Sequence, residues 1–534
     1  MKAVLVAAVL AASFATAPAT ARPPSNDWGR SRVVPAGDVN GDGTGDLAYV
    51  QTSALTTVVE VRDGRDGELL WDVAAGDEWP DPRVPVFAPV GPRGEPGMLL
   101  LARSGAPLAA FGRDGAQLWR VDAARAEQFE GAVSDSTREG RWGRDEPLLG
   151  DLSPGPAVDT LVTTSVEETA GSVYDPGTVR VFAVSIVNGA DGSVRDLAHP
   201  FVSTGSRVVV AVAPDLDRDG LADVLVGTWA GSRALLTAVS SATGLVLWER
   251  HDLGTAYSLR AAYALGDVTG DGVGEVAAHW YDDIGRNDDG VVALFDGATG
   301  ATLWVKPGTS AVSVATGRAG RVVVASPGGP RVTAYDAAGR AAWSVSPPMW
   351  PRRNGYDPIT VRLAGDAQGD GVADVAYGVP RGDWGDPDRD DVSDGLIDGR
   401  TGRLLAARAN GATVSAVDGP IDGRGTDVLR TTVAGRRVTV EARRGGDGRP
   451  LWRTAFDLRA GERVEYAYQA PGAAGRCAPV VVGIVHPGNS QWSPRAVVLS
   501  GADGAPRWGV EQRGSDIVTT PPVAARRRTF ARSC

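Results

Sequence analysis

The stretch PDLDRDGLADVLVG, residues 214–227, sets four aspartates ahead of an apolar segment rich in β-branched residues. Asp215, Asp217, Asp219 and Asp223 stand at positions 1, 3, 5 and 9 of a short loop, with a glycine at position 6. Oxygen ligands at positions 1, 3, 5 and 9 and a backbone carbonyl at position 7 suit a hard cation such as Ca²⁺, and the glycine permits the sharp turn. The stretch therefore predicts a calcium loop followed by a strand, with the carbonyl of Leu221 as a further ligand.

Three further copies of this loop begin at Gly37 (GDVNGDGTGDLAYV), Gly266 (GDVTGDGVGEVAAH) and Gly365 (GDAQGDGVADVAYG). The predicted ligands in these copies are Asp38, Asn40, Asp42, Thr44 and Asp46; Asp267, Thr269, Asp271, Val273 and Glu275; and Asp366, Gln368, Asp370, Val372 and Asp374. The alternative is a metal-free turn held by side-chain to backbone hydrogen bonds. We favour metal because close carboxylates repel one another unless a cation lies between them.

Two degenerate copies begin at Gly150 (GDLSPGPAVDTLV) and Val417 (VDGPIDGRGTDVL). They keep the turn but lack the full set of carboxylates at the ligand positions. We predict that both are metal-free.

A second repeat consists of a turn and a strand that ends in tryptophan, as in DGATGATLW at Trp304. A D-G or T-G pair between two alternating segments is a hairpin signal, because glycine supplies the positive φ that such turns need. The same pattern precedes Trp71, Trp119, Trp248, Trp343, Trp452 and Trp508. We predict that these tryptophans dock at the same place in every repeat.

Together the two repeats define a unit of four short strands, which predicts an all-β protein. Units of this kind cannot bury both faces alone, so they close into a ring of four-stranded sheets, a β-propeller. We predict a single propeller of eight or nine blades over residues 22–512. The C-terminal tail, residues 513–534, contains a segment from Asp516 that resembles a first strand and could close the ring, followed by a basic end.

The Asp loops followed by DVLVG or DVAYG resemble the FG-GAP or VCBS-type repeats of integrin α-chain propellers. The turn followed by a tryptophan strand resembles the docking repeat of quinoprotein propellers. Together these repeats cover nearly all of residues 22–512. The resemblance implies a propeller fold with Ca²⁺ in its loops, and it implies no particular activity.

Residues 1–21, MKAVLVAAVLAASFATAPATA, have the layout of a secretory signal peptide, and so we expect a secreted protein. No later apolar run is long enough to span a bilayer. The formal charge of −11 argues against nucleic acid as the partner, because binding phosphates needs a basic surface. We also expect a monomer. Cys477 and Cys534 either form one bridge or remain two free thiols.

A second group of tryptophans falls in or beside the longer connections, which we expect on the face opposite the Asp loops. Aromatic rings beside carboxylates and arginines suit sugar rings or peptide segments. The predicted ligand-binding residues are Trp79, Trp142, Trp229, Trp280, Tyr281, Trp350, Trp384 and Trp492. The alternative is that such tryptophans cover blade edges.

Catalysis finds little support in the four histidines, which match no catalytic motif. We therefore predict a calcium-binding module for a glycan or an extracellular protein. One alternative is a carbohydrate-active enzyme, a lyase or hydrolase, which uses acids such as Asp383 and Asp386. Another is a quinoprotein-like oxidoreductase, although the adjacent cysteine pair of that family is absent.

Overall fold

The structure is a computed structural model. It describes residues 28–53, 57–75, 84–101, 108–121, 129–131, 149–168, 180–197, 201–203, 209–230, 233–251, 253, 259–281, 290–307, 314–317, 321–326, 331–347, 360–363, 366, 370–378, 395–407, 412–416, 427–444, 449–469, 479–485, 495–513 and 516–529.

The described residues form nine antiparallel sheets that follow one another along the chain, and they contain no helix. The first four sheets, blades 1 to 4, consist of β1 (Trp28–Gly37), β2 (Asp46–Ser53), β3 (Thr57–Arg62) and β4 (Leu69–Ala75); β5 (Val84–Val90), β6 (Glu95–Leu101), β7 (Ala109–Phe111) and β8 (Gln117–Arg120); β9 (Phe129–Gly131), β10 (Leu149–Gly150), β11 (Asp159–Glu168), β12 (Arg180–Val187), β13 (Val194–Asp196) and β14 (Phe201–Ser203); and β15 (Val209–Ala213), β16 (Asp223–Ala230), β17 (Arg233–Val239) and β18 (Val246–Arg250).

Blades 5 to 9 complete the set. They consist of β19 (Leu259–Ala264), β20 (Val276–Tyr281), β21 (Gly290–Phe295) and β22 (Thr302–Pro307); β23 (Val314–Gly317), β24 (Arg321–Ser326), β25 (Arg331–Tyr335) and β26 (Ala341–Val345); β27 (Thr360–Leu363), β28 (Val375–Gly378), β29 (Gly395–Ile397) and β30 (Leu404–Ala407); β31 (Ala412–Ala416), β32 (Val428–Ala434), β33 (Arg437–Arg443) and β34 (Pro450–Asp457), joined by β40 (Ala525–Thr529); and β35 (Arg463–Gln469), β36 (Val480–Val485), β37 (Arg495–Leu499) and β38 (Pro506–Arg513), joined by β39 (Asp516–Thr520).

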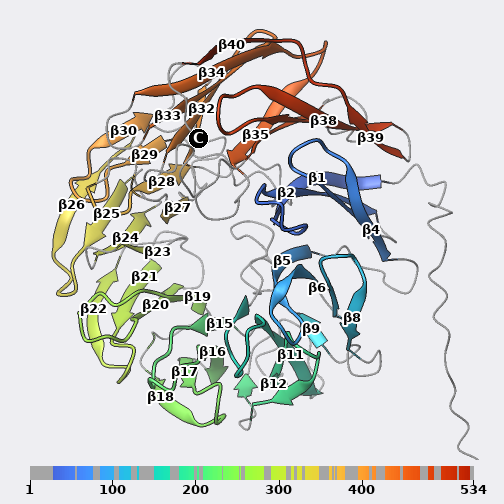
Figure 1. Cartoon of the computed structure of the whole chain (residues 1–534). Helices are drawn as coiled ribbons and strands as arrows, with labels where there is room; N and C mark the ends of the chain where they lie inside the picture. The colour runs from blue at the N-terminus through green and yellow to red at the C-terminus, as the bar shows by residue number, and fades with distance from the viewer. Residues whose placement is uncertain are drawn as a thin grey trace, which may run out of the picture.

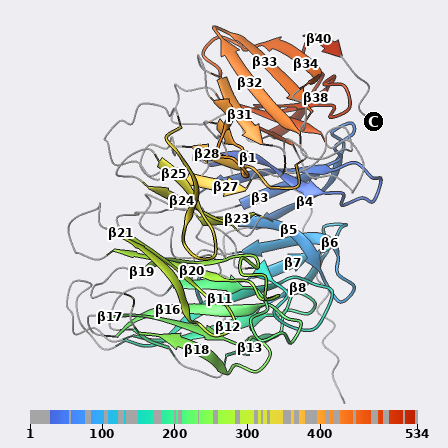
Figure 2. The same ribbon diagram turned by 90° about the vertical axis from the view of Figure 1, so that its left-hand side faces the viewer.

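The sheets stand around a common axis, which confirms the all-β propeller and resolves its blade count as nine (Figure 1). In blades 4 and 5 the first strands, β15 and β19, lie nearest the centre and the fourth strands, β18 and β22, lie at the rim (Figure 1). Figure 2 shows the same ring from the side, with blades 8 and 9 at one end and blades 3 and 4 at the other.

The core lies between neighbouring blades, because both faces of each sheet are apolar and must be covered. Every seam has its own buried cluster. The seam between blades 4 and 5 buries Leu225, Leu236 and Trp248 against Leu259 and Phe295. The smallest cluster lies between blades 7 and 8, where Ala376 and Leu396 are the fully buried members.

The outer-strand tryptophans dock on the hairpin of the following blade. The Trp248 indole Nε1 donates to the Gly297 carbonyl at 2.7 Å, and that of Trp343 donates to the Gly399 carbonyl at 2.9 Å. Blade 3 has no tryptophan here; instead, Arg195 Nη2 donates to the Ser241 carbonyl of blade 4 at 2.6 Å. The tryptophans therefore share one docking position, as predicted, and it lies at the interface between neighbouring blades.

The ring closes through side-chain packing between blades 9 and 1. Trp508 and Val498 of blade 9 pack with Leu47 and Tyr49 of blade 1, and the Trp508 Nε1 donates to the Gly64 carbonyl at 3.4 Å. Among the described strands no pairing crosses this seam.

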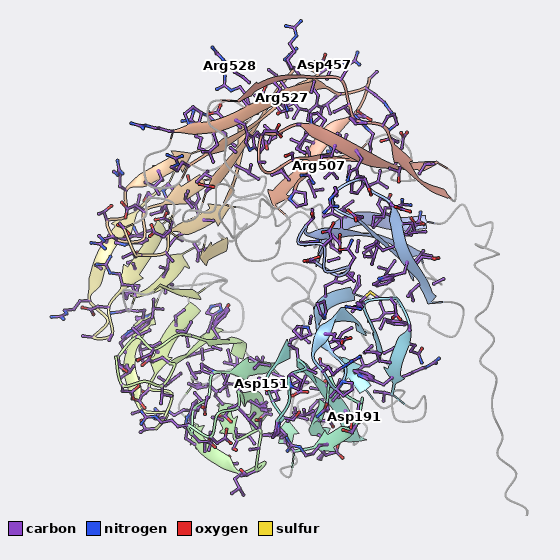
Figure 3. The ribbon with its side chains drawn as sticks, in the orientation of Figure 1. Asp151, Asp191, Asp457, Arg507, Arg527 and Arg528 are labelled. Atoms are coloured by element: carbon purple, nitrogen blue, oxygen red, sulfur yellow. The ribbon has the colours of Figure 1, made fainter. Side chains whose placement is uncertain are left out.

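The tail strands extend two blades instead of pairing with the first one. β39 pairs with β38 at the rim of blade 9, and β40 pairs with β34 at the rim of blade 8. Arg527, which projects from this rim, donates to Asp503 Oδ2 at 2.6 Å (Figure 3). The segment from Asp516 thus adds an outer strand to its own blade.

No helix that is long and apolar enough to cross a membrane occurs among the described residues.

Candidate metal-binding loops

Each Asp loop joins the first and second strands of its blade, and the four loops belong to blades 1, 4, 5 and 7. Position 1 organises the turn. Asp215 Oδ2 accepts the Gly220 N–H at 2.9 Å and its Oδ1 accepts the Asp219 N–H at 3.0 Å. Asp38, Asp267 and Asp366 accept the corresponding glycine N–H in the other loops. The loop backbone is therefore wrapped around the first carboxylate.

Position 5 supports the next part of the turn. Its Oδ1 accepts the position 7 N–H in all four loops, as between Asp219 and Leu221 at 2.9 Å. The other pairs are Asp42 with Thr44, Asp271 with Val273, and Asp370 with Val372. Position 3 contributes Asp217 Oδ1, which accepts the Asp219 N–H at 3.1 Å, while Gln368 lies outside the described residues.

Position 9 is a buried acid, and in blades 1 and 4 it ties the loop to the hairpin of the same blade. Asp223 Oδ2 accepts the Leu216 N–H at 2.7 Å and its Oδ1 accepts the Ser241 N–H at 3.1 Å. Asp46 does the same with Val39 and Gly64. Asp374 accepts the Gly399 N–H, and Glu275 accepts the N–H groups of Val268 and Thr269.

The burial of this acid changes its proton affinity. Burial raises the pKa of Asp46 to about 6 against the backbone hydrogen bonds that lower it. Burial also raises the pKa of Asp223 to about 6, with repulsion from Asp217 and Asp219 adding to the effect. At neutral pH both groups are therefore mostly ionised, with a larger protonated fraction than an exposed carboxyl has.

The carboxylates converge in two of the loops. Oxygens of Asp215, Asp217 and Asp223 lie within 4.8 Å of one another, and so do oxygens of Asp267, Asp271 and Glu275. Ligands at about 2.4 Å from a Ca²⁺ ion lie at most about 4.8 Å apart, so each set fits one ion. Blades 4 and 5 therefore hold the two best candidate sites among the described residues.

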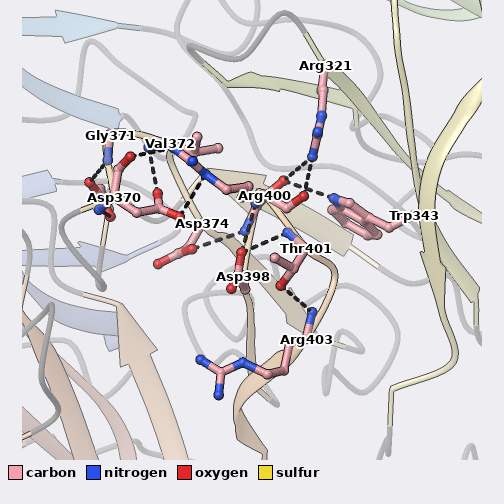
Figure 4. A network of polar contacts seen from close by, with 12 residues as sticks. Arg321, Trp343, Asp370, Gly371, Val372, Asp374, Asp398, Arg400, Thr401 and Arg403 are labelled. Carbon is pink, nitrogen blue, oxygen red and sulfur yellow. Dashed lines mark hydrogen bonds and ion pairs between the residues drawn. The ribbon is translucent and has the colours of Figure 1, made fainter.

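An arginine lies against the loop in the other two blades. Arg65 Nη2 is 2.7 Å from Asp42 Oδ2 in blade 1. Arg400 Nε is 3.0 Å from Asp370 Oδ2 in blade 7 (Figure 4). In these loops the position 5 carboxylate has an arginine as its ion-pair partner.

Arg218 links the loops of blades 4 and 5. It is the one non-glycine residue with a positive φ among the described residues, at 64°, and its Nη2 donates to the Asp271 carbonyl at 2.7 Å. Glycine occupies the same loop position in blades 1 and 5, since an L side chain there is strained. Arg218 makes its contact to blade 5 from this left-handed conformation.

The degenerate loop of blade 3 keeps only the structural part of the arrangement. Asp159 Oδ2 accepts the Leu152 N–H at 3.0 Å and its Oδ1 accepts the Gly189 N–H at 2.8 Å. Ser153 donates to the same carboxylate at 2.8 Å. A buried acid therefore ties loop to hairpin although positions 3 and 5 of this loop, Ser153 and Gly155, lack a carboxylate. Blade 8 has Asp427 fully buried at the equivalent place.

The predicted aromatic ligand residues are placed only in part. Trp280 is 4% exposed and belongs to the core between blades 4 and 5, so its ring is not presented at a surface. Trp229 and Tyr281 lie in β16 and β20, with side chains outside the described part of the structure. Trp79, Trp142, Trp350, Trp384 and Trp492 lie outside the described residues, as do Asp383 and Asp386.

Two features of the site were missed at the level of the sequence. The hairpin N–H donors of Gly64, Ser241 and Gly399 complete the position 9 contact. Arg65 and Arg400 follow the first glycine in DGRDG and DGRTG, which is a recognisable signal. Only the fold brings these hairpins beside the loops.

No family model matches the chain, and no curated protein matches it. Among solved structures, the rhamnogalacturonan lyase YesW is 15% identical with a TM-score of 0.40, covering 76% of this chain and 70% of its own. The Bacillus licheniformis rhamnogalacturonan lyase PL11 is 12% identical with a TM-score of 0.39, covering 93% and 90%. The Dos1 propeller is 9% identical with a TM-score of 0.36, covering 73% and 88%.

These scores carry no argument about activity, so the class follows from the nine sheets themselves. The chain is a nine-bladed β-propeller with acid-rich loops between the first and second strands of four blades. The identity of the repeats as FG-GAP or quinoprotein repeats stays a prediction, because no family model matches.

Proposed function

We propose that this protein is a secreted, calcium-binding propeller that acts as a non-catalytic binding module for a glycan or an extracellular protein. The observation that carries the proposal is the convergence of three carboxylates in the loop of blade 4 and of three more in the loop of blade 5. Three acids so close repel one another, and a divalent cation between them removes that repulsion.

Calcium would act here as a structural ion. The position 9 acid joins the Asp loop to the β17–β18 hairpin in blade 4, and that hairpin receives Arg195 from blade 3. The hairpin of blade 5 receives Trp248 from blade 4. A cation that orders the loop would therefore also stabilise the seams on either side.

The binding role rests on the second group of tryptophans. Trp384 and Trp492 lie outside the described residues, and in the sequence they fall between the second and third strands of blades 7 and 9. The enzyme alternative depends on Asp383 and Asp386 in the same connection as Trp384. A screen of the purified protein against glycans and matrix proteins with calcium present would test the module. Reaction products from a polysaccharide, lost on Asp383→Asn or Asp386→Asn substitution, would favour the enzyme instead.

Calcium binding is tested by a melting curve with millimolar Ca²⁺ and with chelator. Extracellular loops of this kind bind with a Kd on the order of 10⁻⁴–10⁻³ M, so each occupied loop adds about 1 kcal/mol at millimolar ion. We expect a melting temperature that rises with calcium. An Asp217→Asn/Asp271→Asn variant should lose this rise, because Asn keeps the Oδ1 acceptor of each turn but removes the charge.

Asp191→Asn is the matched control for that variant. Asp191 is an exposed hairpin residue whose Oδ1 accepts the Ser193 N–H at 2.9 Å, and it belongs to no Asp loop. It should leave the calcium effect intact. An unchanged melting temperature with and without calcium in the natural sequence would contradict the metal proposal.

A further inference from the structure

The four Asp loops differ in whether an arginine side chain lies against their carboxylates. In blade 1, Arg65 Nη2 lies 2.7 Å from the second oxygen of Asp42. In blade 7, Arg400 contacts Asp370 twice, through Nε to Oδ2 at 3.0 Å and through Nη2 to the carbonyl at 2.6 Å (Figure 4). Both arginines therefore place a positive charge at position 5 of the loop.

The backbone holds each arginine beside its loop. The residue before it is the hairpin glycine whose N–H donates to the buried position 9 acid, Gly64 to Asp46 and Gly399 to Asp374. The arginine N–H then donates to the first hairpin aspartate, which fixes the start of the side chain. The ion pair is thus built on an anchored backbone, although each arginine side chain is more than half exposed.

Blades 4 and 5 carry alanine at the same hairpin position, Ala242 and Ala298. The nearby Arg218 donates to the backbone carbonyl of Asp271 and not to a carboxylate. In these two blades the acids converge within 4.8 Å, whereas no such convergence occurs among the described acids of blades 1 and 7. Among the four loops, the two with an arginine partner show no converging carboxylates, and the two with converging carboxylates have no such arginine.

The free energy of the arginine ion pair is similar to that of calcium binding, so the arginine can determine whether calcium occupies the loop. A surface ion pair shifts an equilibrium by up to about fivefold. For a loop with a Kd on the order of 10⁻⁴–10⁻³ M, millimolar calcium raises the folding equilibrium constant about two- to tenfold. If calcium must first displace the guanidinium, the ion pair is lost, and this loss cancels most of the stabilisation that calcium provides.

We propose that Arg65 and Arg400 are built-in counter-cations, so that calcium enters the loops of blades 4 and 5 and not those of blades 1 and 7. This inference rests on the proposed function for its calcium part. It narrows the four predicted calcium loops to two, and it makes the other two loops independent of metal.

The test measures the number of calcium sites with a Kd of about 1 mM or tighter, from equilibrium dialysis over a series of free-ion concentrations. We expect two ions per chain for the natural sequence and additional ions for an Arg65→Gln/Arg400→Gln variant. Arg113→Gln is the control, because Arg113 stands two residues before the positive-φ glycine of its hairpin, as Arg65 and Arg400 do, and its blade 2 has no Asp loop. It should leave the count at two. Four ions in the natural sequence, or an unchanged count in the double variant, would overturn the inference.

A second measurement separates this inference from the proposed function. In chelator, Arg65→Gln/Arg400→Gln should unfold at lower denaturant than Arg113→Gln, because the loop acids then repel one another with no cation of either kind. Calcium should restore the lost stability. Equal midpoints in chelator would overturn the counter-cation role, whether or not the natural sequence binds calcium. Loss of calcium binding in every variant, with the midpoints still separated, would overturn the calcium part alone.

Discussion

At the scale of single residues, the buried acid at position 9 serves the fold whether or not a metal is present. Asp159 and Asp223 accept the same pair of N–H groups, one from the loop and one from the hairpin. The contacts compensate the cost of burying a carboxylate. The acids at positions 1 and 5 also accept backbone N–H groups of the turn, and a bound cation would add a second role to them.

Asp159→Asn should destabilise the protein by about 1–3 kcal/mol, because the amide can accept from only one side and leaves a buried N–H without its partner. Asp223→Asn should cost a similar amount in chelator and should additionally weaken calcium binding. Denaturant unfolding with and without calcium measures both effects. A calcium-dependent loss for Asp159→Asn would contradict the separation of the two roles.

Stability should also depend on pH through Asp159. Burial raises the pKa of this carboxyl above 3.8, so the folded state holds the proton more tightly than the unfolded chain does. Its contribution to stability is then fully present below pH 3.8 and falls as the pH rises through the raised pKa. The difference in unfolding free energy between the natural sequence and Asp159→Asn should shrink accordingly.

Asp191 provides the opposite sign for comparison. Hydrogen bonds from Ser193 lower the pKa of this exposed carboxyl, so its contribution is present above 3.8 and disappears as the pH falls. Denaturant midpoints for both Asn variants over a pH series measure the two slopes. Slopes of the same sign would show that burial does not dominate at Asp159.

At the scale of elements, the seam depends on a tryptophan of one blade and a glycine of the next. Trp452 is fully buried, and its Nε1 donates to the Gly501 carbonyl at 2.7 Å. Trp71 and Trp304 lack such an acceptor among the described residues, because the following hairpins close one residue earlier, at Gly115 and Gly339. The docking place is common, but the hydrogen bond requires the longer hairpin.

Gly504→Ala should be more damaging than Gly435→Ala. Both glycines have positive φ, 69° and 60°, so both substitutions carry the strain of a left-handed residue, about 1 kcal/mol. At Gly504 a Cβ would also lie 2.4 Å from the Trp452 ring, whereas at Gly435 nothing lies within 4 Å. Thermal unfolding of the two variants compares them directly. Equal losses would show that the seam tolerates displacement of the tryptophan.

At the scale of the whole molecule, the described strands show no exchange between the first and last blades, and side chains pack across the closing seam. The last 21 residues instead lay β39 and β40 along the rims of blades 9 and 8, and Arg62 Nη1 of blade 1 donates to Thr519 Oγ1 of β39 at 2.7 Å. The tail therefore supports the closing seam from outside.

A chain that ends at Arg513 should melt at lower temperature and be cleaved faster by protease. Removing the tail exposes the outer edges of β34 and β38, because β40 and β39 no longer pair with them. It also removes the hydrogen bond between Thr519 and blade 1, so the packing around Trp508 becomes the main contact that closes the ring. Melting curves and a proteolysis time course measure this. A truncated chain with unchanged melting and cleavage would show that side-chain packing alone closes the ring.

Local patterns in the sequence specify the turns and strands of this protein. The Asp loops and hairpins follow from turn chemistry, and the strands follow from alternation of apolar residues, so the four-stranded unit could be predicted. The number of blades, the burial of Trp280, and the arginine partners of Asp42 and Asp370 could not be predicted and are seen only in the folded chain. The reason is that these depend on contacts between segments far apart in the chain, such as Trp508 with Gly64, which no local pattern records.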